Sequence, residues 1–327
     1  MRILFHAIVI SSFLLTGIVA RADDESIALL ERMSIASQQL NYEGVFSHQR
    51  GRRMESIRVI HRSDEQGVVE RLISLNGMPR EVIRNNDVVT CFYPDGKRVN
   101  VNRKPLGRGF PSDLLNRLKS AESYYEVSMG KQGRVAGRSV QGLRVKPVDK
   151  FRYGYFFWVD KESDLLLQSN LIDKKGNVLE TFAFSSIQLN IEIDDDLLQP
   201  EIVGKEIVLK GNSSQPVDSA KTNKPSKWNI GWLPEGFSLT AQQTRKFKNK
   251  KTTVEQHVYS DGLSSVSVFI EEIKASHGHL RGGSSKGATN AFGTIVDRHY
   301  VTVVGEVPAH TVERIGSSIQ MVTKDQL

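Results

Sequence analysis

Short apolar or alternating runs, each closed by a turn, recur along most of this chain and limit the folds open to it. Asn76-Gly77, Asp95-Gly96 and Lys175-Gly176-Asn177 end such runs, and glycine and asparagine tolerate the positive φ angles of hairpin turns. Because strands joined by tight turns pair in opposite directions, the pattern predicts an antiparallel meander. The expected strands are 42–49, 54–62, 68–75, 80–84, 88–93, 97–101, 124–129, 139–147, 153–160, 165–172 and 178–189.

Two amphipathic helices accompany these strands. Residues 26–40 carry apolar side chains at helical spacing with polar residues around the rest of the wheel. Residues 111–118 begin with Pro111 and place Asp113 in the first turn, as a helix N-terminus prefers. We therefore expect a first domain with a long, curled antiparallel sheet and two helices covering one side.

A polar segment divides the chain. Residues 211–227 contain two prolines, no aromatic residue and almost nothing to bury, which is typical of a flexible linker. It separates a first domain, residues 23–210, from a smaller one, residues 228–327. The second domain has expected strands at 237–247, 253–260, 264–273 and 293–304 and an amphipathic helix at 309–321, which predicts an α+β fold.

The N-terminus is typical of an export signal. An apolar run over residues 3–19 follows Arg2, and Ala20-Arg21-Ala22 precedes two acids, so residues 1–22 read as a signal peptide cleaved after Ala22. An uncleaved anchor is the alternative. No other stretch has the roughly 20 apolar residues that cross a bilayer, and the lone Cys91 has no partner for an internal disulfide. We expect a periplasmic chain that is soluble after cleavage.

The charge of the mature chain is modestly basic. The formal charge is +7. Arg2 and Arg21 contribute two of these positive charges, so +5 remains after residues 1–22 are removed. Outside the cytoplasm, this excess favours acidic protein segments or anionic lipid headgroups over nucleic acid as partners.

Motifs for catalysis or metal binding are absent from the sequence. The pair His277-Gly278-His279 lacks further clustered ligands, and 282–287 (GGSSKG) lacks the spacing of a phosphate-binding loop and is expected to be a mobile loop. The acids at 194–196 lack the pattern of a calcium loop and predict a solvated turn. We therefore expect no catalytic residues, no metal and no cofactor, although scattered acids that converge in space remain an alternative.

Aromatic residues suggest a place for a ligand. In 153–160 (YGYFFWVD), side chains alternate, so Tyr155 and Phe157 share one face of a strand while Phe156 and Trp158 share the other. Core packing on one side and helix contact on the other explain this pattern; an apolar cavity for an acyl chain is the alternative. The candidate lipid-binding residues are Phe92, Tyr93, Tyr155, Phe157, Trp158, Phe182 and Phe184.

Five cations gather in seven positions near an expected hairpin tip. They are Arg245, Lys246, Lys248, Lys250 and Lys251. A solvated edge kept positive against aggregation explains them. Contact with an acidic partner or a phosphorylated lipid explains them equally well, so both readings stay open.

Six segments carry a resemblance to a known family. They are 40–44 (LNYEG), 77–82 (GMPREV), 153–160 (YGYFFWVD), 232–237 (WLPEGF), 258–263 (VYSDGL) and 303–308 (VVGEVP). In this order they resemble the RseB/MucB family of periplasmic regulators of an extracytoplasmic sigma factor. The resemblance covers essentially the whole mature chain.

The resemblance has implications for fold and function. It implies a first domain similar to the lipoprotein carriers LolA and LolB, an unclosed β-barrel with helices on its concave side. It implies a non-enzymatic regulator that binds the periplasmic domain of a single-pass membrane anti-sigma factor, RseA or MucA, and shields it from regulated proteolysis. Lipopolysaccharide or lipoprotein acyl chains would release it. A lipoprotein or lipid carrier of the LolA type is the competing hypothesis, and a homo-oligomer is left open.

Overall fold

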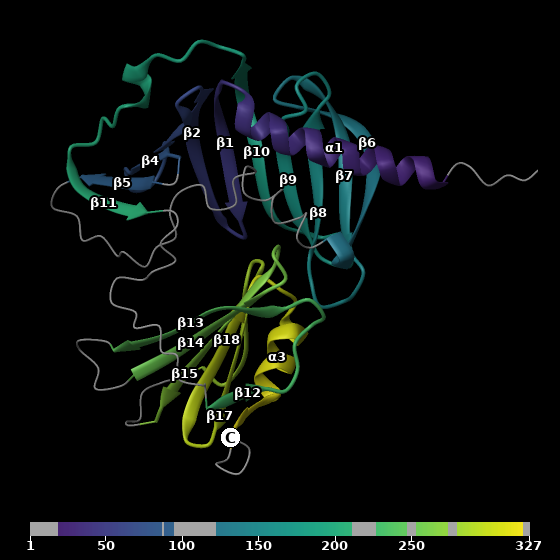
Figure 1. The fold of residues 1–327 in the computed structure, drawn as a ribbon, viewed down its shortest axis with the longest axis vertical. Coiled ribbons are helices and arrows are strands. Elements are labelled where there is room, and N and C mark those ends of the chain that lie inside the picture. The colour runs from purple at the N-terminus through teal and green to yellow at the C-terminus, as the bar shows by residue number, and fades with distance from the viewer. Residues whose placement is uncertain are drawn as a thin grey trace, which may run out of the picture.

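The chain folds into two β-rich domains that follow one another. The computed structural model describes residues 19–86, 88–94, 122–210, 227–246, 253–273 and 280–322. An 11-stranded sheet forms the first domain, and a six-stranded sheet forms the second (Figure 1). Within these described ranges, no helix is long and apolar enough to cross a bilayer.

The first domain is one helix against an open antiparallel sheet. Its elements are α1 (Val19–Gln39), β1 (Tyr42–Arg50), β2 (Arg53–Asp64), β3 (Gly67–Ser74), β4 (Glu81–Asn85), β5 (Val88–Pro94), η1 (Glu122–Tyr124), β6 (Tyr125–Val135), β7 (Arg138–Pro147), β8 (Gly154–Asp160), β9 (Leu166–Ile172), β10 (Val178–Leu189), η2 (Asp195–Leu198) and β11 (Gly204–Lys210). The strand order is β11-β5-β4-β3-β2-β1-β10-β9-β8-β7-β6. The sheet is antiparallel, as predicted, but it consists of two meanders, β1 to β5 and β6 to β10, joined by the pairing of β1 with β10, and β11 pairs with β5 at one edge.

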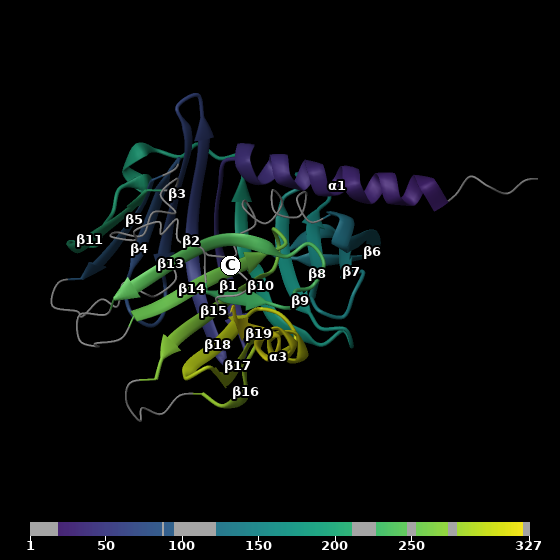
Figure 2. The same ribbon diagram turned by 60° about the horizontal axis from the view of Figure 1, so that its bottom comes forward.

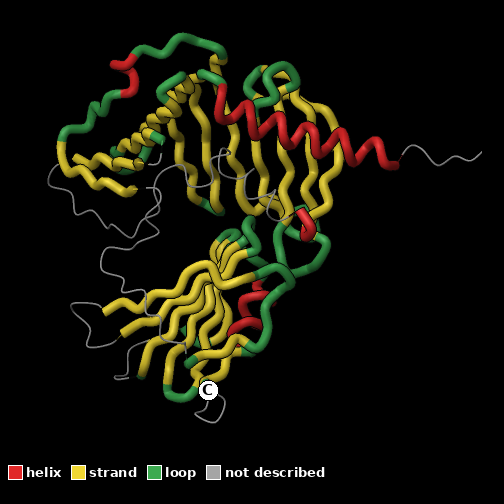
Figure 3. The backbone as a smooth tube through the Cα atoms, in the orientation of Figure 1, coloured by secondary structure: helices red, strands yellow, loops and turns green. Residues whose placement is uncertain are grey.

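Helix α1 crosses one face of this sheet (Figures 1 and 3). Leu29 and Met33 of the helix are buried in a cluster with Leu143, Phe157 and Leu166 of the strands. Burial of such side chains contributes roughly 1.5–3 kcal/mol each, which fixes the helix on the sheet. This is the unclosed antiparallel barrel with a helix against one face that the resemblance to LolA and LolB implies.

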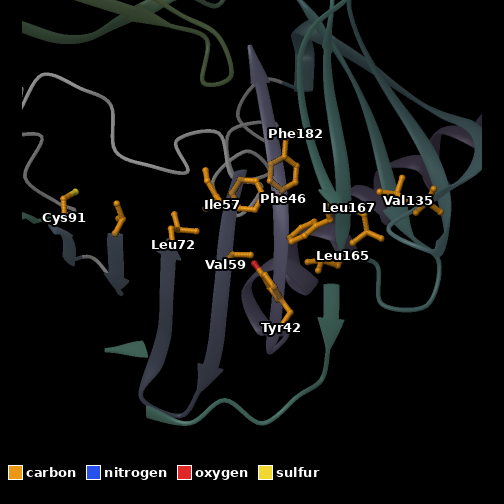
Figure 4. Packing of buried hydrophobic residues seen from close by; sticks show 13 residues of the cluster. Tyr42, Phe46, Ile57, Val59, Leu72, Cys91, Val135, Leu165, Leu167 and Phe182 are labelled. Atoms are coloured by element: carbon orange, nitrogen blue, oxygen red, sulfur yellow. The ribbon is translucent and has the colours of Figure 1, made fainter. Parts of the chain in front are cut away.

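A second cluster fills the middle of the same domain (Figure 4). Tyr42, Phe46, Val59, Leu72 and Phe184 are almost fully buried in it. They occupy alternate positions of neighbouring strands, because successive side chains of a strand point to opposite faces. The side-chain period of two thus gathers these residues on one face of the sheet.

The second domain combines a sheet with one helix. Its elements are β12 (Trp228–Ile230), β13 (Ser238–Lys246), β14 (Thr253–Ser260), β15 (Ser265–Glu272), β16 (Gly282–Lys286), β17 (Thr289–Val296), β18 (His299–Gly305), α3 (Ala309–Ser317) and β19 (Ile319–Met321). The six-stranded sheet has the order β13-β14-β15-β18-β17-β16, and β12 pairs with β19. Val312 and Ile315 of α3 pack with the sheet residues Val301 and Val303. The predicted α+β class is confirmed.

One expected strand is in fact a hairpin. The run 293–304 contains two strands, β17 and β18, joined by Asp297 and Arg298 at φ angles of 43° and 62°. Both residues are in the left-handed region, which a two-residue turn of this kind needs and which glycine or asparagine usually supplies. The sequence prediction of one strand was wrong because the turn lacks those residues.

Several further elements differ from the predictions, among them β6, which continues to Val135 where an end at 129 was expected. The expected helix 309–321 ends at Ser317, and β19 follows because Ile319 pairs with Ile230. The expected mobile loop 282–287 is mostly strand β16, paired with β17. Strands β11 and β12 were not predicted, whereas α1 begins at Val19, before the expected start at 26.

Some predicted features lie outside the described residues. They are the signal segment up to residue 18, the strand at 97–101, the helix at 111–118, the linker apart from Lys227, and the pair His277 and His279. The expected cleavage site after Ala22 falls within α1. These expectations stay predictions.

Candidate functional site: the junction of the two domains

The predicted lipid-binding residues divide between several environments. Phe182 and Phe184 are buried in the central cluster of the first domain, and Tyr93 and Trp158 pack against it. Phe157 lies in the cluster under α1. The structure thus brings four of the seven together around one cluster, and their role in lipid binding stays a prediction.

The other two predicted lipid-binding residues lie apart from that group. Tyr155 packs at the edge of the cluster under α1. Phe92 lines a pocket of about 840 Å³ on the opposite face of β5 from Cys91 and Tyr93, which face the central cluster. The floor of this pocket includes Val69 and Ile83, and the segment that follows β10 forms one wall with Leu198, Gln199 and Pro200.

Two of the five predicted partner-binding cations lie at the end of a strand in the second sheet. Arg245 and Lys246 end β13, and Lys246 is opposite Thr253 in the pairing with β14. The expected hairpin is therefore present at its base. Lys248, Lys250 and Lys251 lie outside the described residues.

Sequence reasoning missed the most developed polar site, which joins the two domains. The second domain meets one end of the first sheet (Figures 1 and 2). There, the loop between β7 and β8, residues 148–153, provides contacts to the second domain from Phe151, Arg152 and Tyr153. We call this loop the junction loop.

Arg152 is the centre of the junction. Its side chain is 0% exposed, and its Nε atom lies 2.7 Å from Oδ2 of Asp261 in the second domain, whose side chain is also 0% exposed. A second guanidinium nitrogen donates to Asp149 at 2.9 Å, and the third donates to the carbonyl of Glu235. Buried charges are tolerated only when paired and hydrogen-bonded in this way.

Aromatic rings complete the enclosure of this guanidinium. The ring centroid of Tyr124 in the first domain lies 4.7 Å from Cζ of Arg152, and that of Phe237 in the second lies 5.3 Å away. Gly236 has a φ of 82° and approaches the Tyr124 ring so closely that a Cβ atom would overlap it. A cation over a desolvated ring gains about 2 kcal/mol. Ring contacts from both domains therefore stabilise the same guanidinium group.

Asp261 also shapes the segment that enters the first domain. Its Oδ1 atom accepts hydrogen bonds from the backbone N–H groups of Leu263 (2.9 Å) and Ser264 (2.6 Å). The turn delivers the Leu263 side chain into the cluster under α1, together with Phe157. The hydroxyls of Ser264 and Tyr125 lie 3.2 Å apart. Burial and the nearby Asp261 carboxylate raise the pKa of Tyr125, which keeps that hydroxyl protonated.

A second contact area surrounds Tyr153. Nδ2 of Asn290 donates to the Tyr153 hydroxyl at 2.9 Å and to the carbonyl of Val307 at 2.7 Å. Ala288 is fully buried against Tyr153. The hydroxyl of Thr311 donates to the carbonyl of Phe151 at 3.0 Å. Apolar packing and hydrogen bonds therefore both cross the junction.

The rim of the junction is ionic. Arg50 of β1 binds Glu180 of β10 at 2.8 Å and Glu306 of the second domain at 2.9 Å. His48 Nε2 lies 2.5 Å from the same Glu180. Burial opposes ionisation of Glu180, but the hydrogen bonds from His48 and Arg50 prevail and hold the pKa of this carboxyl below its usual value.

The junction is built to hold two domains in one arrangement. Its polar groups bind one another, and no group of three or more metal-ligating side chains occurs in the described part of the chain. A pair of buried charges has a narrow range of favourable geometries, because desolvation is offset only when every partner is in place. A ligand that changes this arrangement would act on both domains at once.

The comparisons with known proteins cover both domains. Residues 25–202 match the MucB/RseB N-terminal domain, and residues 222–320 match the MucB/RseB C-terminal domain. The sigma-E factor regulatory protein RseB of Escherichia coli K12 is 30% identical over 322 residues, which are 97% of each chain. These names describe regulatory proteins.

Two solved structures of MucB are also similar. MucB in complex with MucA(peri) superposes with a TM-score of 0.69 at 28% identity, covering 91% of this chain and 99% of that one. A structure of MucB for which no partner is named superposes with a TM-score of 0.58 at 26% identity, covering 91% and 98%. The family matches and the similarity in structure agree over both domains, and the chain belongs to the MucB/RseB family.

Proposed function

We propose that this chain is a periplasmic regulator that binds the periplasmic domain of a membrane anti-sigma factor, in the domain arrangement that Arg152 holds. The observation that carries the proposal is the superposition of both domains on MucB in its complex with MucA(peri). The TM-score is higher for that complex, 0.69, than for the MucB structure without a named partner, 0.58, at the same coverage of this chain. This difference supports the present arrangement as the one that binds the partner.

The junction offers a physical reason for such a dependence. A partner that contacts both domains binds tightly only when their surfaces are held in one geometry, because ordering them on binding would cost affinity. The contacts of Arg152 with Asp261, Glu235 and Phe237 supply that order in advance. The cations at the end of β13 would add an electrostatic contribution to affinity by attracting an acidic segment of the partner.

The direct test is calorimetric titration of the chain with the periplasmic domain of an anti-sigma factor of the MucA type. We expect a saturable binding isotherm dominated by one binding event. Neutralising the cations from Arg245 to Lys251 should weaken binding most at low ionic strength, because exposed charges are screened by salt. No binding at low or moderate salt would refute the proposal.

Protection of the partner and release by lipid form the finer part of the proposal. Bound chain would shield the anti-sigma factor from proteases, and acyl chains of lipopolysaccharide or lipoprotein would occupy the first domain near Phe182 and Phe184. Coupling between two binding sites is reciprocal and usually amounts to about 5–150-fold in affinity. Saturating lipid should therefore weaken partner binding within that range, and equal affinities with and without lipid would remove the switch from the proposal.

A further inference from the structure

Strands β6, β7 and β8 have one face toward α1, with Phe157, and an opposite face, here called the outer face. The outer face carries two aromatic rings, Phe156 and Trp158, that lie close against glycines, and Trp158 also reaches the central cluster. A Cβ atom at Gly130 or Gly142 would lie 2.8 Å from Cζ of Phe156, and one at Gly133 would lie 2.7 Å from Cζ3 of Trp158. These distances are closer than side chains tolerate, so only glycine lets the rings lie against the backbone there. The two rings are 4.9 Å apart in an edge-to-face arrangement.

Each ring supports one exposed cation. Cζ of Arg144 lies 5.4 Å from the Phe156 centroid, and Nζ of Lys131 lies 5.9 Å from that of Trp158. Both cations are exposed. A guanidinium held over a ring uses none of its N–H groups in that contact, so they can donate to the oxygens of a phosphate group.

These cations differ from most arginines of the same sheet. Among the residues that the structure describes, neither Lys131 nor Arg144 has a carboxylate partner. Most other arginines of this sheet pair with a carboxylate, as in Arg58–Glu43, Arg80–Glu55, Arg84–Glu70 and Arg138–Asp160, whereas Arg134 donates to the carbonyl of Gly137. Two oriented cations without internal partners leave positive charge available to a ligand.

Polar side chains extend the same face. In the strand pairing, Phe156 lies between Arg144 and Asn170, and Trp158 lies opposite Gln168. Nε2 of Gln168 donates to Oδ1 of Asn170 at 3.2 Å, which leaves the Nδ2 donor of Asn170 and the Oε1 acceptor of Gln168 for the hydroxyl groups that accompany a phosphate in a headgroup. We propose that Arg144 and Lys131, held on Phe156 and Trp158, bind a phosphate group, presented by a lipid headgroup or free in solution.

Vesicle binding by the whole chain tests the site. Vesicles of equal parts phosphatidylcholine and phosphatidylglycerol should bind the protein, and pure phosphatidylcholine should bind it far less. In the double variant K131Q/R144Q, affinity for the mixed vesicles should fall about 25-fold, because each cation at a membrane surface contributes about 5-fold. The matched control is K174Q/K175Q, which removes two exposed cations from the turn after β9; its loss should stay below about 5-fold.

A competition experiment separates the two sources of phosphate. If inorganic phosphate displaces more protein from the mixed vesicles than sodium chloride does at equal ionic strength, the site binds free phosphate as well as headgroups. If the two salts displace equal amounts, the site binds headgroups only. Equal vesicle binding by wild type and K131Q/R144Q, or none by either, would overturn the proposal. So would a loss of anti-sigma factor affinity in K131Q/R144Q with vesicle binding intact. Wild-type vesicle binding without partner binding would refute the proposed function alone.

Discussion

The domain junction and the outer face of β6 to β8 both place an arginine against aromatic rings, but with opposite consequences. Arg152 is enclosed by Tyr124 and Phe237 and is paired with buried Asp261. Arg144 lies over Phe156 at an exposed position without a carboxylate among the described residues. The first arrangement uses the charge to join two parts of the protein, whereas the second leaves it available to a ligand.

The difference lies in burial and in the balance of charge. Removing one partner of a buried ion pair leaves an uncompensated charge in a medium of low polarity, which is strongly destabilising. Removing an exposed cation costs only its contact with the ring. Substitution of Arg152 should therefore lower the free energy of unfolding far more than substitution of Arg144. Substitution of Arg144 should instead have the larger effect on ligand binding at the outer face.

The largest effect is expected from Arg152→Met. This substitution leaves Asp261 buried without its countercharge, and the expected loss is about 3–5 kcal/mol of unfolding free energy. Small-angle scattering should also show a larger radius of gyration, because the second domain loses its fixed position. Urea unfolding and scattering of the full chain measure the two effects.

Two variants make this prediction specific. R152M/D261N removes both charges and should be less destabilised than R152M alone. R138M breaks the pair of Arg138 with Asp160 inside the first domain, so it should lower stability without changing the radius of gyration. A radius of gyration unchanged by R152M would mean that the other junction contacts suffice to hold the domains.

The next effect concerns the apolar part of the junction. Leu263→Ala removes a side chain that is 5% exposed in the cluster under α1. Truncation of a buried leucine costs about 2–5 kcal/mol through lost burial and a residual cavity. The control is Leu239→Ala on β13, where the side chain is 49% exposed, and its cost should stay within about 0.5 kcal/mol. Equal costs in thermal unfolding would show that Leu263 does not anchor the second domain.

The sequence revealed the sheets more completely than the junction. Alternation and turn residues are local signals, so β1 to β5 and β7 to β10 could be predicted close to their observed bounds, whereas β6 extends to Val135, beyond its expected end at 129. The turn at Asp297 and Arg298 has no such signal, and the hairpin of β17 and β18 was read as one strand. Arg152 and Asp261 form a pair only after folding, and nothing local distinguishes them from solvated charges.

A weaker signal for the junction was nevertheless present in the sequence. Four of the segments that carry the family resemblance meet there: Tyr153 begins one, Glu235 lies in the second, Asp261 in the third and Glu306 in the fourth. The aromatic residues of β8 were instead interpreted as candidates for the wall of a lipid cavity. Alternation correctly separated the faces of Phe157 and Trp158, but it did not indicate which face binds a ligand.

A pH titration tests the ionic rim of the junction. Glu180 has a lowered pKa in the folded chain, so its contribution to stability is complete above the ordinary carboxyl pKa of about 4.3 and is lost as the pH falls through the folded value. Because Glu180 holds Arg50, which binds Glu306, acid should loosen the junction. In E180Q, the free energy of unfolding should therefore fall less than in wild type as the pH is lowered from neutral to acid.

The control for this titration lies inside the first domain. Burial opposes ionisation of Asp160 too, but hydrogen bonds from Arg138 and Ser163 lower its pKa. D160N should therefore remove an acid-dependent part of the stability and leave the acid response of the radius of gyration as in wild type. If E180Q and D160N change scattering equally, the rim does not couple pH to the arrangement of the domains.

The smallest effect is expected from Arg144→Met, the same substitution as at Arg152 but on the outer face. Arg144 is exposed, so its replacement leaves no buried carboxylate unpaired among the described residues and removes only the contact with Phe156. The loss in urea unfolding should be about 0.5–1 kcal/mol, the value of an exposed cation–ring pair, and the radius of gyration should not change.

This matched pair of substitutions decides the comparison, because the chemistry of the change is identical at both positions. R152M should lose stability and the fixed domain arrangement while its outer face still binds anionic vesicles. R144M should keep both and lose part of its vesicle binding. If R144M were as destabilised as R152M, the cation over Phe156 would be part of the structural core, and the outer face could no longer be regarded as a surface kept free for a ligand.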